Sequence, residues 1–85
     1  VAVTLDRIIE EYKINEIDIL DIDVEGFELD VWRSLTKIKP KVVIVEYDTQ
    51  GVIKTECRDA ILDTNEYNLA HTTKINDIFM LKVGK

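Results

Sequence analysis

The fold can be read outward from one stretch of the chain, Ile17-Asp18-Ile19-Leu20-Asp21-Ile22-Asp23-Val24-Glu25-Gly26. Residues 17–24 are rich in Ile and Val, which favour extended structure, although three aspartates interrupt them. Gly26 tolerates the backbone angles of a tight turn, and an amphipathic segment follows it. The stretch therefore predicts a strand over 17–24 that passes directly into a helix.

Amphipathic segments lie on both sides of this strand. Thr4 can cap a helix that continues to Tyr12, because four apolar residues with helical spacing follow it: Leu5, Ile8, Ile9 and Tyr12. A second helix is expected from about Phe27 to Ile38, with Pro40 stopping it. A helix thus precedes the strand and another follows it.

The second half of the chain repeats the alternation of strand and helix. Lys41 to Asp48 contains Val42-Val43-Ile44-Val45, an unbroken apolar run of the kind found in parallel strands covered on both faces. We expect a third helix from Ile53 to near Asn65. Strands over 67–73 and 78–83, joined by a turn at Asn76-Asp77, should pair antiparallel. The sequence predicts one α/β domain over 1–85, with a mostly parallel sheet and a C-terminal antiparallel hairpin.

Composition excludes several classes of partner. The 85 residues carry a formal charge of -6, which disfavours nucleic acid and anionic membranes. The longest apolar run, Val42 to Val45, is too short to span a bilayer. Cys57 is the single cysteine, so no internal disulfide can form, and a cytoplasmic setting is expected.

Acidic residues gather where the expected strands end. Asp23 and Glu25 lie at the end of the first strand, and Glu46 and Asp48 end the second. Ligands of open α/β sheets bind beyond the carboxyl ends of parallel strands, so these acids could share one ligand-binding rim. The alternative is structural, because an acid before a helix often serves only as a cap. Mg²⁺ or Ca²⁺ would also suit such carboxylates, but we favour a site without metal.

Three segments together resemble the FkbM family of methyltransferases: Thr4-Leu5-Asp6, the stretch from Ile17 to Glu28, and Val42-Val43-Ile44-Val45-Glu46-Tyr47. The resemblance implies a class I methyltransferase fold with strand order 3-2-1-4-5-7-6, of which this chain would supply strands 4 to 7. It also implies methyl transfer from S-adenosylmethionine, usually to a hydroxyl of a small molecule or sugar. Asp23 would then be both catalytic and cofactor-binding, Glu25 catalytic, and Gly26 cofactor-binding.

The chain departs from that family in two ways. Asp21 stands where the family commonly has Lys, which reverses the local charge. No counterpart exists for the glycine-rich loop or the ribose-binding acid, since the only glycines are Gly26, Gly51 and Gly84. We therefore expect these residues not to hold the cofactor alone. The alternative function is a non-catalytic α/β interaction module, and strand 17–24, deprived of a neighbour, could pair two copies into a homodimer.

Overall fold

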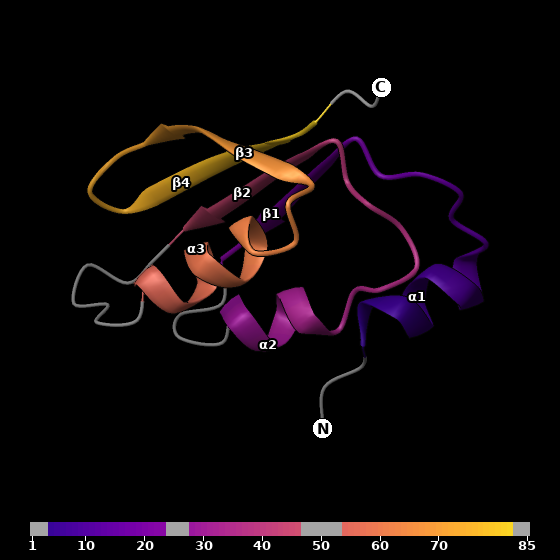
Figure 1. Ribbon diagram of the computed structural model, residues 1–85. Helices are drawn as coiled ribbons and strands as arrows, with labels where there is room; N and C mark the ends of the chain where they lie inside the picture. Colours follow the sequence, from indigo (N-terminus) through magenta and orange to yellow (C-terminus); the bar gives the residue numbers. More distant parts are fainter. Residues whose placement is uncertain (1–3, 24–27, 47–53, 83–85) are drawn as a thin grey trace.

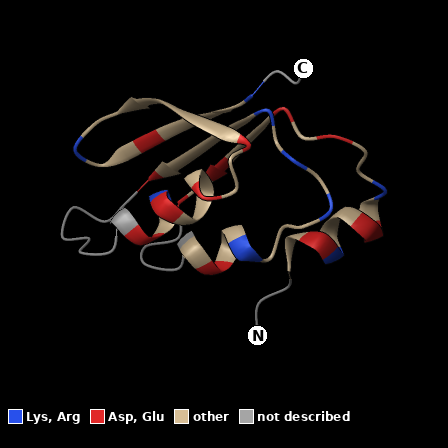
Figure 2. Ribbon diagram, viewed as in Figure 1, with Lys and Arg blue, Asp and Glu red and all other residues tan. Residues whose placement is uncertain are grey.

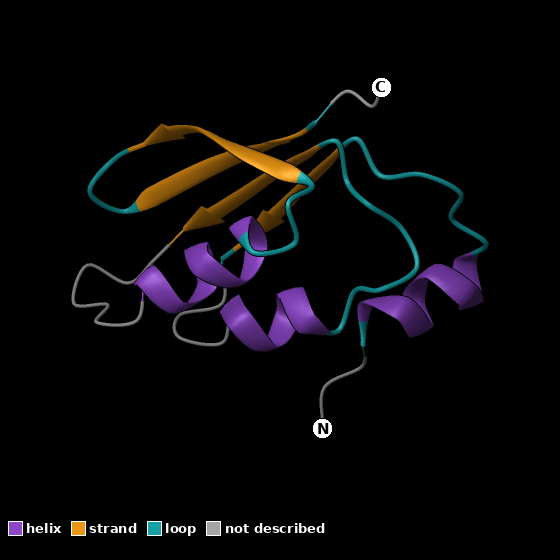
Figure 3. Ribbon diagram, in the orientation of Figure 1, coloured by secondary structure: helices purple, strands orange, loops and turns teal. Residues whose placement is uncertain are grey.

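The computed structural model describes residues 4–23, 28–46 and 54–82 of the chain. Three helices lie on one side of a four-stranded sheet (Figures 1 and 3). In chain order the elements are α1 (Leu5–Tyr12), β1 (Ile19–Ile22), α2 (Glu28–Arg33), β2 (Val42–Glu46), α3 (Lys54–Leu62), β3 (Tyr67–Thr72) and β4 (Asn76–Leu81). This order of helices and strands is the one the sequence predicts.

The sheet is mixed, with strand order β1-β2-β4-β3. β1 pairs with β2 in parallel, whereas β4 runs antiparallel to both β2 and β3. Three strands therefore share one direction, but only one neighbouring pair is parallel, because β4 inserts between β2 and β3. The expectation of a mostly parallel sheet is met only in part, and the expected C-terminal hairpin is confirmed. The order matches the segment 4-5-7-6 that the resemblance implies.

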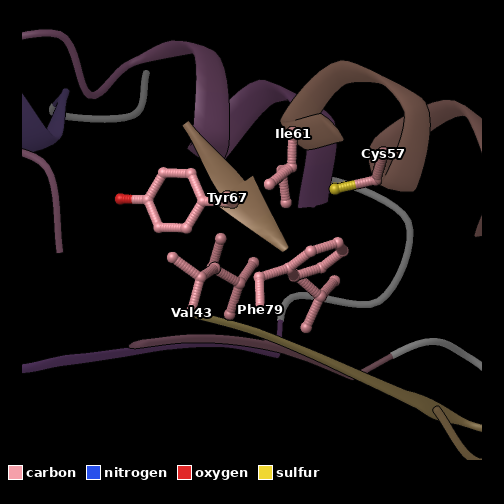
Figure 4. Close-up of a cluster of buried hydrophobic side chains, with 7 residues drawn as sticks. Val43, Cys57, Ile61, Tyr67 and Phe79 are labelled. Carbon is pink, nitrogen blue, oxygen red and sulfur yellow. The ribbon is translucent and has the colours of Figure 1, made fainter. Parts of the chain in front are cut away.

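The core lies between the sheet and helices α2 and α3. Seven buried side chains form it: Ile22, Val43, Val45, Cys57, Ile61, Tyr67 and Phe79 (Figure 4). Val43, Val45, Ile61 and Phe79 are fully buried, as a well-packed core requires. Cys57 of α3 lies in this core at 2% exposure, so its thiol is buried.

The opposite side of the sheet carries a second apolar row, which no described helix covers. Side chains alternate across a sheet, so the neighbours of the core residues point to this open face. The register aligns Ile19 with Val42 and Val42 with Met80, and Ile44 with Ile78. Ile19 is 61% exposed and Met80 is 51% exposed. Hereafter "the open face" means Ile19, Val42, Ile44, Ile78 and Met80.

Helix α2 is shorter than the sequence predicts. The expected helix reached Ile38, but α2 ends at Arg33, and the start at Phe27 lies outside the described residues. Beyond its end, the N–H groups of Thr36 and Lys37 donate to the carboxylate of Asp6 instead of to carbonyls one turn back. A contact with a residue thirty positions away therefore takes the hydrogen bonds that would extend the helix.

The hairpin turn also differs from expectation. Asn76 and Asp77 were expected to form the turn, yet both belong to β4, and the turn lies at Thr73–Ile75. The Thr73 hydroxyl accepts hydrogen bonds from the backbone N–H groups of Ile75 and Asn76. Asp77 can enter a strand because its carboxylate is fully buried against Arg58, which supplies the opposite charge.

The other strand expectations were close. β1 covers the middle of the expected 17–24, β2 covers most of 41–48, and β3 covers all but one residue of 67–73. Helix α1 begins after Thr4, whose hydroxyl accepts from the N–H of Arg7, so the predicted cap is confirmed. Across the described ranges, no helix is both long and apolar enough to cross a membrane.

Candidate functional site

Three carboxylates meet at the carboxyl ends of β1 and β2. The parallel register pairs Asp21 with Ile44 and Ile22 with Val45, so its continuation sets Asp23 beside Glu46. Because Ile22 and Val45 point into the core, the alternation sends Asp21, Asp23 and Glu46 to the other side of the sheet. Hereafter "the acidic rim" means these three residues, which extend the apolar row of the open face.

The negative charges of the rim affect the pKa of Glu46. The negative charges of Asp21 and Asp23 raise the pKa of Glu46 above its ordinary value, and partial desolvation adds to the effect. A side-chain hydrogen bond between Glu46 and Asp21 contributes further. Glu46 is half-buried, whereas Asp21 and Asp23 are exposed.

A neutral side chain borders the rim on the next strand. Asn76 of β4 is the register partner of Glu46. Its side-chain oxygen Oδ1 is buried and has no hydrogen-bond partner within the described part of the chain. Buried polar atoms are nearly always paired, so this acceptor stands out beside the carboxylates.

The structure brings together only part of the expected constellation. Asp23 and Glu46 meet, as their positions at the ends of neighbouring strands predicted. Glu25, Gly26 and Asp48 lie outside the described residues. The sequence drew attention to Asp21 only because the family commonly has Lys at that position. Asn76 was expected in a turn. The signal for Asp21 was its spacing, since residues two apart in a strand share one face.

The helix side of the sheet holds a buried ion pair near the same end. Asp77, the register partner of Val45, accepts from Arg58 Nε and Nη2 at 2.9 Å each. The hydroxyl of Thr72 donates to the same carboxylate at 2.6 Å. This network links α3 to the β3–β4 hairpin. It therefore helps to hold β4 against β2 from the side of the sheet opposite to the rim.

The single histidine and the lysines between α2 and β2 lie away from the rim. His71 is exposed on β3, the edge strand farthest from β1. The lysines between α2 and β2 all form ion pairs: Lys37 with Glu10, Lys39 with Glu66, and Lys41 with Glu16 and Asp18. Figure 2 shows how basic and acidic residues are distributed along the ribbon. These pairs neutralise what the sequence shows as a small basic cluster.

The described residues do not form a complete binding site for a metal ion or for S-adenosylmethionine. Within the ranges 4–23, 28–46 and 54–82, no three His, Cys, Asp or Glu side chains are arranged to hold a metal ion. The 85 residues include no glycine-rich turn for a nucleotide cofactor. The acidic rim can receive donors of hydrogen bonds or positive charge, but it offers no groups that would cradle the whole of S-adenosylmethionine.

The described residues form a small α/β domain with a four-stranded mixed sheet. A family model of the FkbM methyltransferase domain matches residues 1–78. The chain therefore belongs to the FkbM methyltransferase family. No curated protein and no solved structure matches it. S-adenosylmethionine is the methyl donor that membership of a methyltransferase family suggests.

Proposed function

We propose that this chain is the acceptor-side portion of an S-adenosylmethionine-dependent methyltransferase that methylates a hydroxyl oxygen of a small molecule or sugar. The observation that carries the proposal is the pairing of Asp23 with Glu46 at the ends of two parallel strands, in a chain of a methyltransferase family. Ligands of open α/β sheets bind at such strand ends.

The rim has the groups that methylation of a hydroxyl requires. The acceptor oxygen must be oriented in line, and its proton needs somewhere to go. Asp23 is exposed and can accept a hydrogen bond from the acceptor hydroxyl, and then its proton. Glu46, whose pKa is raised by the charges of Asp21 and Asp23, lies beside it and can contact a second oxygen of the acceptor. Glu25 remains a catalytic candidate and Gly26 a cofactor-binding candidate on the resemblance alone.

The chain by itself should not bind the cofactor tightly. Nucleotide cofactors of such sheets depend on a glycine-rich turn and a ribose-binding acid, for which these residues have no counterpart. Titration calorimetry of the purified chain with S-adenosylmethionine should show no saturable binding at micromolar concentrations. A micromolar dissociation constant would refute this part of the proposal.

The catalytic part is tested by Asp23→Asn in an enzyme that contains this chain. We expect methyl transfer to fall by about a hundredfold, the contribution typical of one acid–base group, with no fall in the melting temperature. Asp30→Asn, at an exposed position on α2, is the matched control and should alter neither quantity. Normal turnover of a destabilised Asp23→Asn protein would show that the residue is only a structural cap.

A second candidate function is a non-catalytic interaction module. The open face favours it, as does the outer edge of β1, which pairs with no described strand, since both are surfaces that other polypeptides can cover. A coding sequence upstream with a strand followed by a Gly-x-Gly loop would decide for the enzyme. For either function we propose a cytoplasmic setting, consistent with the single buried cysteine.

A further inference from the structure

A cavity of about 290 Å³ lies between the end of α2, the segment leading to β2, and the turn between α3 and β3. Its apolar wall is formed by Trp32, Leu35, Ile38 and Tyr67. The volume is near the lower limit for pockets that hold small molecules, and the remaining lining residues are polar or charged: Arg33, Thr36, Lys39, Thr64 and Glu66. The cavity adjoins the start of β2, whereas the acidic rim lies at its end, so the two sites are separate.

Structural contacts hold the cavity wall in place. The hydroxyl of Tyr67 donates to the carbonyl of Pro40 at 2.6 Å, and this bond is buried. The rings of Trp32 and Tyr67 meet edge to face, with centroids 5.6 Å apart and planes at 80°. Asp6 fixes the adjoining segment through Thr36 and Lys37. A wall held this way is largely preformed, so a ligand need not first order it.

Arg33 contributes a positive charge to the cavity lining, and it also borders a neighbouring hollow that three acidic residues line. Three charged residues line it: Arg33, Lys39 and Glu66. Lys39 and Glu66 form an ion pair and offset one another. Arg33 is exposed and makes no ion pair or side-chain hydrogen bond within the described part of the chain. A guanidinium beside an aromatic wall matches a ligand with a flat apolar body and one carboxylate.

We propose that this cavity binds a small planar aromatic carboxylate, with the ring against Trp32 and the carboxylate at the guanidinium of Arg33. The site is independent of methyl transfer, because none of its lining residues belongs to the acidic rim. It offers a second small-molecule site at the opposite end of β2 from the proposed acceptor.

The test uses two probes of the same shape, 2-naphthoate and its uncharged isostere 2-naphthamide. Trp32 is the only tryptophan, so its indole N–H gives one assignable signal in a ¹H–¹⁵N spectrum of the whole chain. We expect both probes to shift that signal saturably. The carboxylate should bind roughly five- to tenfold more tightly, the gain expected from one partly exposed charge-assisted hydrogen bond.

Arg33→Gln should remove the preference for the carboxylate and leave binding of 2-naphthamide unchanged. Because Arg33 is exposed, this variant should keep the fold, which the rest of the spectrum reports. The proposal is overturned by an absence of saturable shifts at Trp32, by equal affinities for the two probes, or by an unaltered preference in Arg33→Gln. Shifts centred on Ile44 and Ile78 would also overturn it, because they would place the probes on the open face.

Discussion

The carboxylate of Asp6, in the first turn of α1, accepts hydrogen bonds from both the backbone N–H and the hydroxyl of Thr36, at 2.7 and 2.5 Å. The N–H of Lys37 donates to the same carboxylate at 3.0 Å. Thr4-Leu5-Asp6, one of the segments that carried the family resemblance, is therefore a structural joint. It caps α1 through Thr4 and fastens α1 to the chain after α2 through Asp6.

Asp6→Asn should weaken the contact of α1 with Thr36 and Lys37, and so destabilise the fold, at neutral pH. The hydrogen bonds from Thr36 lower the pKa of Asp6 below its ordinary value. A lowered folded-state pKa stabilises the fold above the unfolded-state value, and that stabilisation is lost as the pH falls through the lowered pKa. We expect the variant to melt about 3 °C lower at neutral pH, since the contact is exposed and screened. The difference should vanish in acid.

Glu11→Gln is the matched control for Asp6→Asn. Glu11 is another acid of α1, but its ion pair is with Arg7 on the same exposed helical face. Loss of this ion pair should leave the melting temperature nearly unchanged. Circular dichroism melts of both variants across pH provide the measurement. An equal effect of the two substitutions would show that charge on α1, and not the joint to Thr36, is what matters.

Asp77→Ala should be the most damaging substitution of a polar residue on β4. Asp77 is fully buried, and the paired Arg58 is 27% exposed. Breaking such a pair from one side typically costs about 3 kcal/mol, because the other charge loses its partner. The double variant with Arg58→Ala should cost clearly less than the sum of the two single losses. Urea denaturation measures all three, and strict additivity would contradict a coupled pair.

The same ion pair shows where sequence reasoning failed. Asn76-Asp77 has the composition of a turn, and local propensity carries no information that Arg58 neutralises Asp77 from another element. The end of α2 failed for a similar reason, because Asp6 takes the N–H groups of Thr36 and Lys37. Where local and tertiary signals agree, as in the capped helix α1 and the apolar run of β2, the elements were predicted closely.

The sequence predicted where the candidate site lies, but it did not predict all of the residues that form it. The ends of two neighbouring parallel strands identified Asp23 and Glu46 before the register was known. Asp21 and Asn76 needed the register itself, since each joins the rim only through its neighbour across the sheet. Strand pairing is a long-range property, so no single stretch of sequence contains it.

Glu46→Gln should stabilise the fold at neutral pH. Asp21 and Asp23 raise the pKa of Glu46, so the folded state disfavours its charged form. A raised pKa gives stability below the unfolded-state value that is lost as the pH rises through the folded-state value. The variant should therefore melt about 2 °C higher than the parent at neutral pH, and the gain should disappear in mild acid.

Glu16→Gln provides the comparison for Glu46→Gln. Glu16 is an exposed acid that forms an ion pair with Lys41. Its neutralisation removes attraction and not repulsion, so it should produce no gain at neutral pH. Thermal melts across the carboxyl titration range give the measurement. A stabilisation of equal size in both variants would point to the net negative charge of the chain, and not to the rim, as the cause.

We further predict that the chain self-associates through β1, the edge strand of the sheet. The expected homodimer strand, 17–24, is represented in the structure by Ile19–Ile22, whose outer side pairs with no described strand. The carbonyl of Asp18 accepts from the N–H of Val42. By alternation, the backbone groups of Leu20 then also point to β2, and those of Ile19 and Asp21 point outward. Two such edges could pair antiparallel about a two-fold axis.

Proline substitutions separate this edge from the fold itself. Ile19→Pro removes an outward N–H and should abolish the dimer, whereas Leu20→Pro removes an inward one and should unfold the chain. Ile19→Ala keeps the N–H and controls for the lost side chain, so it should still dimerise. The acids Asp18 and Asp21 would face those of the second copy, so added salt should strengthen association. Light scattering across a concentration series decides, and a monomer up to about millimolar concentration in high salt would rule out pairing through β1, because specific pairing of this kind should already be populated there.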